Sequence, residues 1–170
     1  MVAGRPVTLE SIVDDLAEIT GRIVWSTVST TDRLGQPRVR IMHPVWEITP
    51  ASVVGFVGTR RTPVKTAHIA KSPWVTCAYW SPAHDAAFLD CHVSWAGPEV
   101  WDRLAAGYDP STLWPDGPQS ADFAAWELRP YRIQVIRGAD VAAGKASPIW
   151  TSSSTTNTVD YSSDEKEQIA

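Results

Sequence analysis

The stretch from Val57 to Val75, V-G-T-R-R-T-P-V-K-T-A-H-I-A-K-S-P-W-V, gathers basic side chains without a single carboxylate between them. Thr62-Pro63 has the chemistry of a helix start, because threonine is a good N-cap and proline fits the first helical position. We expect the helix to end before Ser72-Pro73, because a residue that precedes proline avoids the helical region. The basic residues are Arg60, Arg61, Lys65, His68 and Lys71.

A helix start carries free backbone N–H groups and about half a positive charge. Arg60, Arg61 and Lys65 would repel one another there unless an anion lies among them. A phosphate ester fits, because arginine offers paired donors, lysine a point charge and the helix end its N–H groups. The sequence contains no Walker loop or dinucleotide fingerprint. The alternative is a solvated turn whose arginines pair with remote carboxylates such as Glu47 or Asp90.

The length, net charge and cysteine content of the chain limit the class of protein that it can be. At 170 residues the chain has the length of one domain, and its net charge of −4 argues against nucleic-acid or anionic-membrane partners. It has no long apolar run, so we expect a cytoplasmic protein. Cys77 and Cys91 form neither a zinc set nor a disulfide framework, and no metal site is expected. We expect both cysteines to be small buried hydrophobes.

The elements that must position the basic stretch are mainly strands. Thr8 is expected to cap a helix that ends at Gly21, with Leu9, Ile12, Val13, Leu16 and Ile19 on its apolar face. Runs rich in β-branched and aromatic residues, separated by turn residues, predict six strands, at 22–30, 37–48, 52–58, 73–81, 86–97 and 126–138. Six strands with one helix between the third and fourth indicate a small antiparallel barrel. We expect one domain over residues 1–150 and a disordered polar tail over 151–170.

Two further segments concern the site. In the strand at 86–97, Leu89, Cys91, Val93 and Trp95 should face the core, and Phe88, Asp90, His92 and Ser94 the other side. After a short helix at about 98–106, the proline-rich and glycine-rich loop 107–120 should lack regular structure. Loops of this length are often functional or packed on a neighbour.

The chain resembles the pyridoxamine-phosphate-oxidase-like, FMN-binding split-barrel family. The motifs are S-T-V-S-T-T-D-R-L-G-Q-P-R-V-R-I-M-H-P-V-W, a strand that ends V-G-T, and P-V-K-T-A-H-I-A-K-S-P-W-V-T. The match covers roughly Leu9 to Trp101, with a weaker echo at 126–138 and Trp150. It implies a six-stranded split β-barrel and a homodimer with FMN in a cleft between the protomers.

The resemblance also implies site residues. Lys65, with Gly58 and Thr59 at the strand end, would contact the cofactor phosphate, and the segment Arg40, Ile41, Met42 and His43 would run along the flavin ring. The family's usual arginine before the lysine is Val64 here, and we expect Arg60 and Arg61 to compensate. The R-L-H-D-R-like segment that grips the vitamin-B6 substrate is replaced by V-A-A-G-K-A-S-P-I-W, so strict pyridoxamine-phosphate oxidase activity is not expected.

An actinobacterial branch of the same fold uses a 5-deazaflavin, coenzyme F-420, in place of FMN. Arginine outnumbers lysine here and alanine is abundant, which fits a GC-rich genome and keeps that branch open. The sequence does not separate the two cofactors.

The resemblance implies an oxidoreductase that passes two electrons to or from a small substrate, with the chemistry on the cofactor. Trp80, His92 and Trp126 are candidates for the substrate pocket, and His92 is the one candidate proton donor. His43 is expected to be structural or a ring contact, and His68, one turn beyond Lys65, to edge the anion site or face solvent. The alternatives are a carrier or sensor that binds a flavin or other aromatic anion without turnover, and a barrel without a cofactor.

Overall fold

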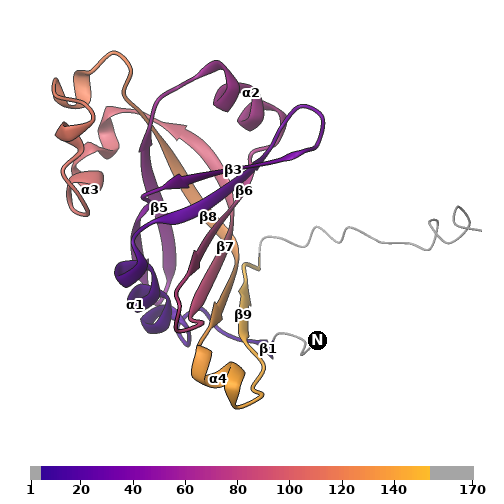
Figure 1. Cartoon of the computed structure of the whole chain (residues 1–170). Coiled ribbons are helices and arrows are strands. Elements are labelled where there is room, and N and C mark those ends of the chain that lie inside the picture. The colour runs from indigo at the N-terminus through magenta and orange to yellow at the C-terminus, as the bar shows by residue number, and fades with distance from the viewer. Residues whose placement is uncertain (1–4, 154–170) are drawn as a thin grey trace, which may run out of the picture.

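The computed structural model describes residues 5–153 of the chain (Figure 1). Its strands are β1 Arg5–Pro6, β2 Ser26–Thr31, β3 Pro37–Met42, β4 Val45–Thr49, β5 Ser52–Thr59, β6 Trp74–Trp80, β7 Ala86–Ala96, β8 Ala124–Ile136 and β9 Pro148–Thr151. Its helices are α1 Val13–Ile23, α2 Pro63–Lys71, α3 Trp101–Ala105 and α4 Gly138–Ala142, with 3-10 turns η1 Pro98–Val100, η2 Pro110–Thr112 and η3 Gly117–Gln119.

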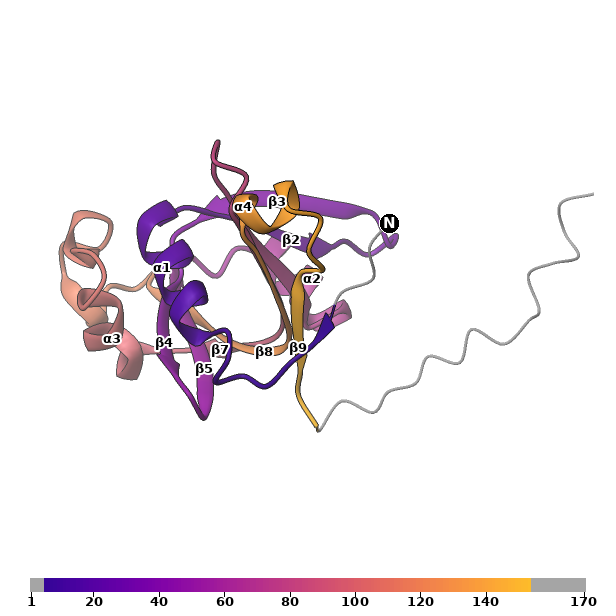
Figure 2. The same ribbon diagram turned by 90° about the horizontal axis from the view of Figure 1, so that it is seen from below.

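All nine strands of the described residues belong to one strongly curved sheet in the order β1-β9-β8-β7-β6-β2-β3, with β5 pairing β8 and β4 pairing β5. The edge strands β3 and β4 do not pair with each other, so the barrel is not closed. Figure 2 shows the strands curving around one core, with α1 beside β4. The fold is mainly β with a few short helices, as predicted.

The predicted count of six antiparallel strands is wrong in detail. The expected strand at 37–48 is divided at His43-Pro44 into β3, which pairs with β2, and β4, which pairs with β5. Proline has no N–H for a ladder, which favours a break at this point. The short strands β1 and β9 were not predicted, and they form the one parallel pair among the described strands.

The opening helix is shifted from its prediction. The Thr8 carbonyl accepts hydrogen bonds from the backbone N–H and the hydroxyl of Ser11, so Thr8 begins a turn and does not cap α1. Gly21 does not stop the helix, which continues to Ile23 and ends where Val24 adopts a positive φ of 64°. The predicted apolar face is correct, since all five of its residues are buried.

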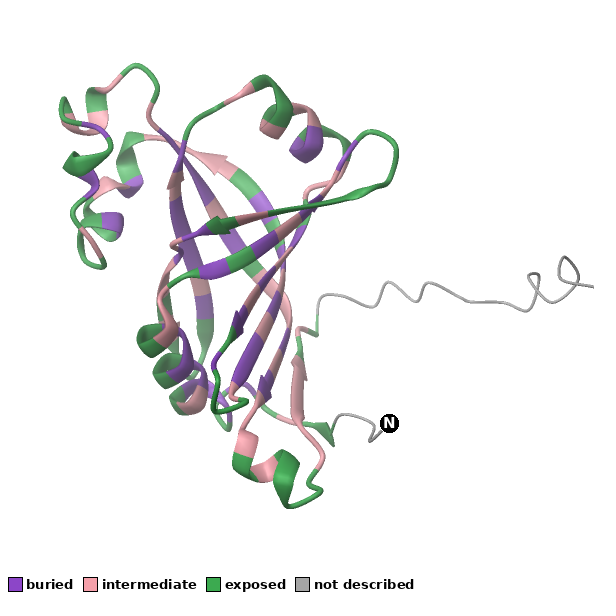
Figure 3. Cartoon of the chain, in the orientation of Figure 1, coloured by how far each residue is buried: buried purple, intermediate pink, exposed green. Residues whose placement is uncertain are grey.

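The core lies inside the curved sheet and under α1 (Figure 3). The alternation predicted for β7 is confirmed: Leu89, Cys91 and Val93 are buried, whereas His92 and Ser94 are exposed. Both cysteines are free and buried, as expected.

The helix after β5 matches its prediction at both ends. Thr62 caps α2, its Oγ1 accepting from the Lys65 backbone N–H at 3.3 Å, and Pro63 is the first helical residue. The helix ends at Lys71, before the extended Ser72. The short helix predicted near 98–106 appears as η1 and α3, and loop 107–120 contains only the two 3-10 turns η2 and η3.

The predicted disordered tail at 151–170 lies outside the described residues apart from its first three. Of these, Thr151 ends β9 and Ser152 donates its backbone N–H to the Tyr131 carbonyl. None of the helices between residues 5 and 153 has the length and apolar character needed to cross a membrane.

Candidate functional site

One cavity of about 820 Å³ lies where β3, the end of β5, the start of α2 and loop 107–120 meet. Its volume is within the range of about 300–1,000 Å³ that is usual for small-molecule sites. Of the nine residues predicted to bind a cofactor, eight line it: Arg40, Ile41, Met42, His43, Gly58, Thr59, Arg60 and Lys65. The other lining residues are Trp25, Thr62, Tyr108, Asp109, Thr112, Leu113 and Trp114.

One end of the cavity is cationic and is centred on Lys65. The Lys65 Nζ donates to Thr59 Oγ1 at 2.6 Å and to the Arg60 carbonyl at 3.3 Å, and no carboxylate pairs with it among the described residues. Burial lowers the pKa of Lys65, and the nearby positive charges of Arg40 and Arg60 lower it further. Lys65 is therefore held among like charges at a helix N-terminus, an arrangement that an anion would relieve.

Arg40 extends the same positive region from β3. Its Nη1 donates to Thr30 Oγ1 at 2.7 Å, and no carboxylate contacts it in the part of the chain that the structure describes. Burial lowers the pKa of Arg40, although a guanidinium stays charged at physiological pH. Asp109, the acidic residue that lines the cavity, accepts from the Ser111 N–H and hydroxyl at 3.0 and 2.6 Å. Its carboxylate thus caps η2 and forms no ion pair with Lys65 or Arg40.

The two arginines before α2 have different environments. Arg60 lines the cavity but also donates to Asp122 Oδ2 at 2.5 Å, and its guanidinium lies 5.9 Å from the centre of the Trp114 ring. Arg61 turns away and stacks 4.6 Å from the centre of the Trp95 ring. The structure therefore brings Arg60 to the cavity and leaves Arg61 outside it. The remote carboxylates considered from the sequence, Glu47 and Asp90, pair with other arginines.

The opposite end of the cavity is aromatic. The ring of His43 lies 5.4 Å from that of Trp25 and 4.7 Å from that of Tyr108, measured between centroids. Burial lowers the pKa of His43, which favours the neutral ring at physiological pH. Ile41, Leu113 and the 60% exposed Trp25 complete an apolar rim. This end is suited to a flat, uncharged ring system.

Gly58 lets loop 107–120 approach β5. A Cβ at this position would lie 2.6 Å from the Tyr108 hydroxyl and 3.0 Å from the Trp114 ring. Glycine thus permits these two aromatic side chains to wall the cavity. Loop 107–120 was expected to be functional or packed on a neighbour. Trp25, Tyr108 and Trp114 were not predicted as site residues, because their approach depends on tertiary packing.

The residues predicted to line a substrate pocket lie elsewhere. Trp126 is fully buried in the core, where its ring packs edge-on against Trp95. Trp80 is exposed at the end of β6, near His84. His92 is exposed on β7, where it contacts the edge of Trp74. None of the three lines the cavity.

His68 does not edge the cavity or face solvent, because it is buried and its Nδ1 lies 3.1 Å from Thr30 Oγ1. No group of three or more histidine, cysteine or acidic side chains suited to a metal occurs among residues 5–153.

Comparison with known proteins links this geometry to one fold. No protein-family model matches the sequence, and a search of curated proteins finds no significant match. Among solved structures, the chain is similar to a Clostridium acetobutylicum protein related to general stress protein 26, of the pyridoxinephosphate oxidase family, with a TM-score of 0.63 and 12% identity over 75% of this chain and 89% of that one.

Two more structures share the architecture. One is a pyridoxamine 5'-phosphate oxidase-related, FMN-binding protein from Nostoc punctiforme, with a TM-score of 0.56 and 13% identity over 74% of this chain and 84% of that one. The other is an F-420 reductase, with a TM-score of 0.53 and 17% identity over 69% of this chain and 94% of that one. The chain therefore has the fold of the pyridoxamine 5'-phosphate oxidase-related proteins.

Proposed function

We propose that the protein is a flavin-dependent oxidoreductase that binds FMN in the cavity between β3, α2 and loop 107–120. The observation that carries the proposal is the uncompensated charge of Lys65 and Arg40 at the capped start of α2, in the same cavity as an aromatic wall. A phosphate ester attached to a flat ring has the matching chemistry at both ends.

The residues divide into two groups by role. The Lys65 ammonium, the Thr59 hydroxyl and the backbone N–H groups at the start of α2 would hold the phosphate. Arg40 would add its positive charge to the phosphate end. Ile41, Met42 and His43 on β3, with Trp25 and Tyr108, would orient the ring and exclude water from it. A bound flavin supplies the two-electron chemistry. The chain's own residues would set the position and environment of the flavin, and the substrate would be a small, flat organic molecule.

The proposal includes a homodimer. Trp25, Ile41 and Leu113 all lie at the rim of the cavity with more than half of their surface exposed. A second copy of the chain packed against this rim would cover these apolar side chains and enclose the cofactor. The homodimer would appear as twice the monomer mass in light scattering of the purified protein.

A deazaflavin-dependent reductase is the second candidate, favoured by the similarity to an F-420 reductase structure. Coenzyme F-420 also presents a flat ring and a phosphate, so the same two ends of the cavity could accept it. A non-catalytic carrier or sensor is the third, because no hydrogen bond joins two titratable side chains among the described residues that line the cavity.

Titration and reduction separate these functions. Purified protein is titrated separately with FMN and coenzyme F-420, followed by absorption and fluorescence, and the tighter cofactor is identified. The FMN-loaded protein is then mixed with NADH or NADPH without oxygen. Reduction of the bound flavin and reoxidation by an added acceptor support the FMN oxidoreductase. Preference for F-420 supports the reductase, and binding without reduction supports a carrier. If neither cofactor binds, the proposal fails.

A further inference from the structure

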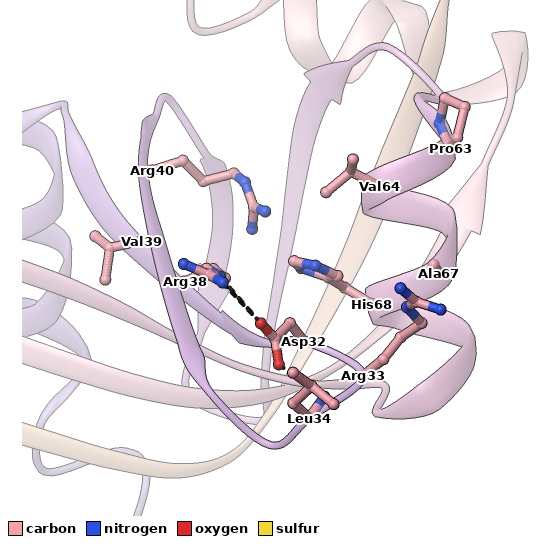
Figure 4. A pocket seen from close by; sticks show the side chains of 10 residues that line it. All are labelled: Asp32, Arg33, Leu34, Arg38, Val39, Arg40, Pro63, Val64, Ala67 and His68. Atoms are coloured by element: carbon pink, nitrogen blue, oxygen red, sulfur yellow. Dashed lines mark hydrogen bonds and ion pairs between the residues drawn. The ribbon is translucent and has the colours of Figure 1, made fainter.

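A second cavity of about 750 Å³ lies on the other side of Arg40, between the β2–β3 turn and α2 (Figure 4). The turn and β3 supply one wall, and the first two turns of α2 supply the other. Its lining residues are Asp32, Arg33, Leu34, Arg38, Val39, Arg40, Pro63, Val64, Ala67 and His68. Among residues 5–153, Arg40 is the one residue that lines both this cavity and the candidate cofactor cavity.

The second cavity carries excess positive charge. Asp32 is the one acidic residue among the described residues that line it. Its carboxylate accepts from the Leu34 and Gln36 N–H groups at 2.8 and 3.0 Å and pairs with Arg38 at 3.0 Å. Arg33, in contrast, makes no side-chain hydrogen bond or ion pair with any residue that the structure describes. The guanidinium of Arg33 is therefore available to an anion from outside the chain.

The same cavity has an exposed apolar wall. Leu34, Val39 and Val64 are 81%, 61% and 60% exposed, yet all three border one cavity. Figure 4 shows Leu34 from the turn and Val64 from α2 beside the arginines, across the cavity from each other. Exposed aliphatic side chains next to the unpaired Arg33 guanidinium match a ligand with an apolar body and one anionic end.

A buried hydroxyl fixes the polar groups between the two cavities. Thr30 Oγ1 accepts from Arg40 Nη1 at 2.7 Å and lies 3.1 Å from His68 Nδ1. Thr30 thus connects Arg40 on β3 to His68 on α2, and both of these residues line the second cavity.

From these observations we propose that the second cavity is a binding site for a small organic anion with an aliphatic or aromatic body, distinct from the cofactor site. Arg33 supplies the principal free charge, and Leu34, Val39 and Val64 supply the apolar wall. A carboxylate and a phosphate monoester share this chemistry, and the two are separated by experiment.

The test is an NMR titration of the full chain, labelled with ¹⁵N and free of flavin, with octanoate, octyl phosphate and octanol in turn. We expect octanoate, octyl phosphate or both to shift the amides of Arg33, Leu34 and Ala67, which line the second cavity and not the first, with octanol at least tenfold weaker. The stronger anion identifies the head group. The proposal is overturned if no anion shifts these amides, or if octanol binds as well as the anions do.

Two variants make the test specific. Arg33→Glu should weaken anion binding by about tenfold. The matched control is Arg5→Glu, an exposed arginine on β1 at the far end of the molecule, which should leave it unchanged. Lys65→Ala alters only the first cavity, so the shifts should persist. Equal binding by Arg33→Glu and wild type, or loss of the shifts in Lys65→Ala, would contradict the assignment.

Discussion

The two ends of the candidate cofactor cavity are built from different kinds of structure. The cationic end rests on regular elements: Thr59 ends β5, Lys65 lies in the first turn of α2, and Arg40 projects from β3. The aromatic end depends on Tyr108 and Trp114 from loop 107–120, placed against Gly58. Local sequence rules therefore describe the first end well and the second poorly.

The difference also separates two contributions to binding. Charge-assisted hydrogen bonds at the cationic end favour ligands that carry a phosphate over ligands that lack one. The aromatic end, in contrast, offers contact area to any flat ring. Changes at one end should consequently alter phosphate selectivity, and changes at the other should alter ring affinity. Four predictions, ordered from the largest expected effect, test this division.

Lys65→Ala should weaken FMN binding by about tenfold or more, because it removes a charge-assisted contact to the phosphate. Riboflavin, which lacks the phosphate, should bind the variant about as well as it binds the wild type. Fluorescence quenching measures both. Lys71→Ala is the matched control and should bind FMN normally, because Lys71 is exposed at the far end of the same helix. An equal loss for FMN and riboflavin would contradict the division of roles.

Gly58→Ala should disturb the aromatic end, because the new Cβ would lie 2.6 Å from the Tyr108 hydroxyl. We expect a loss of about 1–3 kcal/mol of unfolding free energy, measured by urea titration, and weaker binding of both FMN and riboflavin. Gly21→Ala is the control, since nothing lies within 4 Å of a Cβ there and the site is inside α1. That change should stabilise the protein by up to about 1 kcal/mol.

Arg60→Ala should weaken FMN binding by about threefold, because Arg60 lines the cavity but is already paired with Asp122. Arg61→Ala should have no effect, because Arg61 stacks on Trp95 outside the cavity. Isothermal titration of the two single variants distinguishes them. If Arg61→Ala lost more FMN affinity than Arg60→Ala, neither arginine would have the role assigned to it from this structure.

FMN affinity should fall as the pH rises. The fall should begin at a lower pH than it would for a lysine with an unshifted pKa. The phosphate favours protonated Lys65, and the pKa of Lys65 in the free protein is lowered by burial and by Arg40 and Arg60. Affinity should therefore decline as the pH rises through that lowered pKa, because deprotonation removes the charge. Titrations between about pH 7 and 9.5 measure this, with the always-charged Lys65→Arg as reference. Parallel pH profiles for the two proteins would rule out the explanation.

The sequence predicted those features of the fold that depend on neighbouring residues, and it missed those that depend on tertiary contacts. The limits of α2 and the two faces of β7 were correct, because N-capping by Thr62 and a period-two pattern are properties of a few neighbouring residues. The start of α1 was wrong, since Thr8 forms a turn with Ser11 instead of a cap. The division between β3 and β4 was missed because it depends on which strand each segment pairs with.

The site residues could likewise be predicted only where neighbouring residues determine the structure. The residues around the capped helix were foreseen, yet Trp126 was placed in a pocket and is fully buried. Its type fits a core as well as a ligand site, so only the fold could decide. Trp25 and Tyr108 were overlooked because they reach His43 from separate parts of the chain.

The most direct test of the central claim compares FMN with riboflavin on the wild-type protein under identical conditions. The claim is that Lys65, Thr59 and the start of α2 hold a phosphate ester. FMN should then bind at least about tenfold more tightly than riboflavin, the value expected for a charge-assisted phosphate contact. Equal affinities for the two flavins would show that the cations at this helix start do not form a phosphate site.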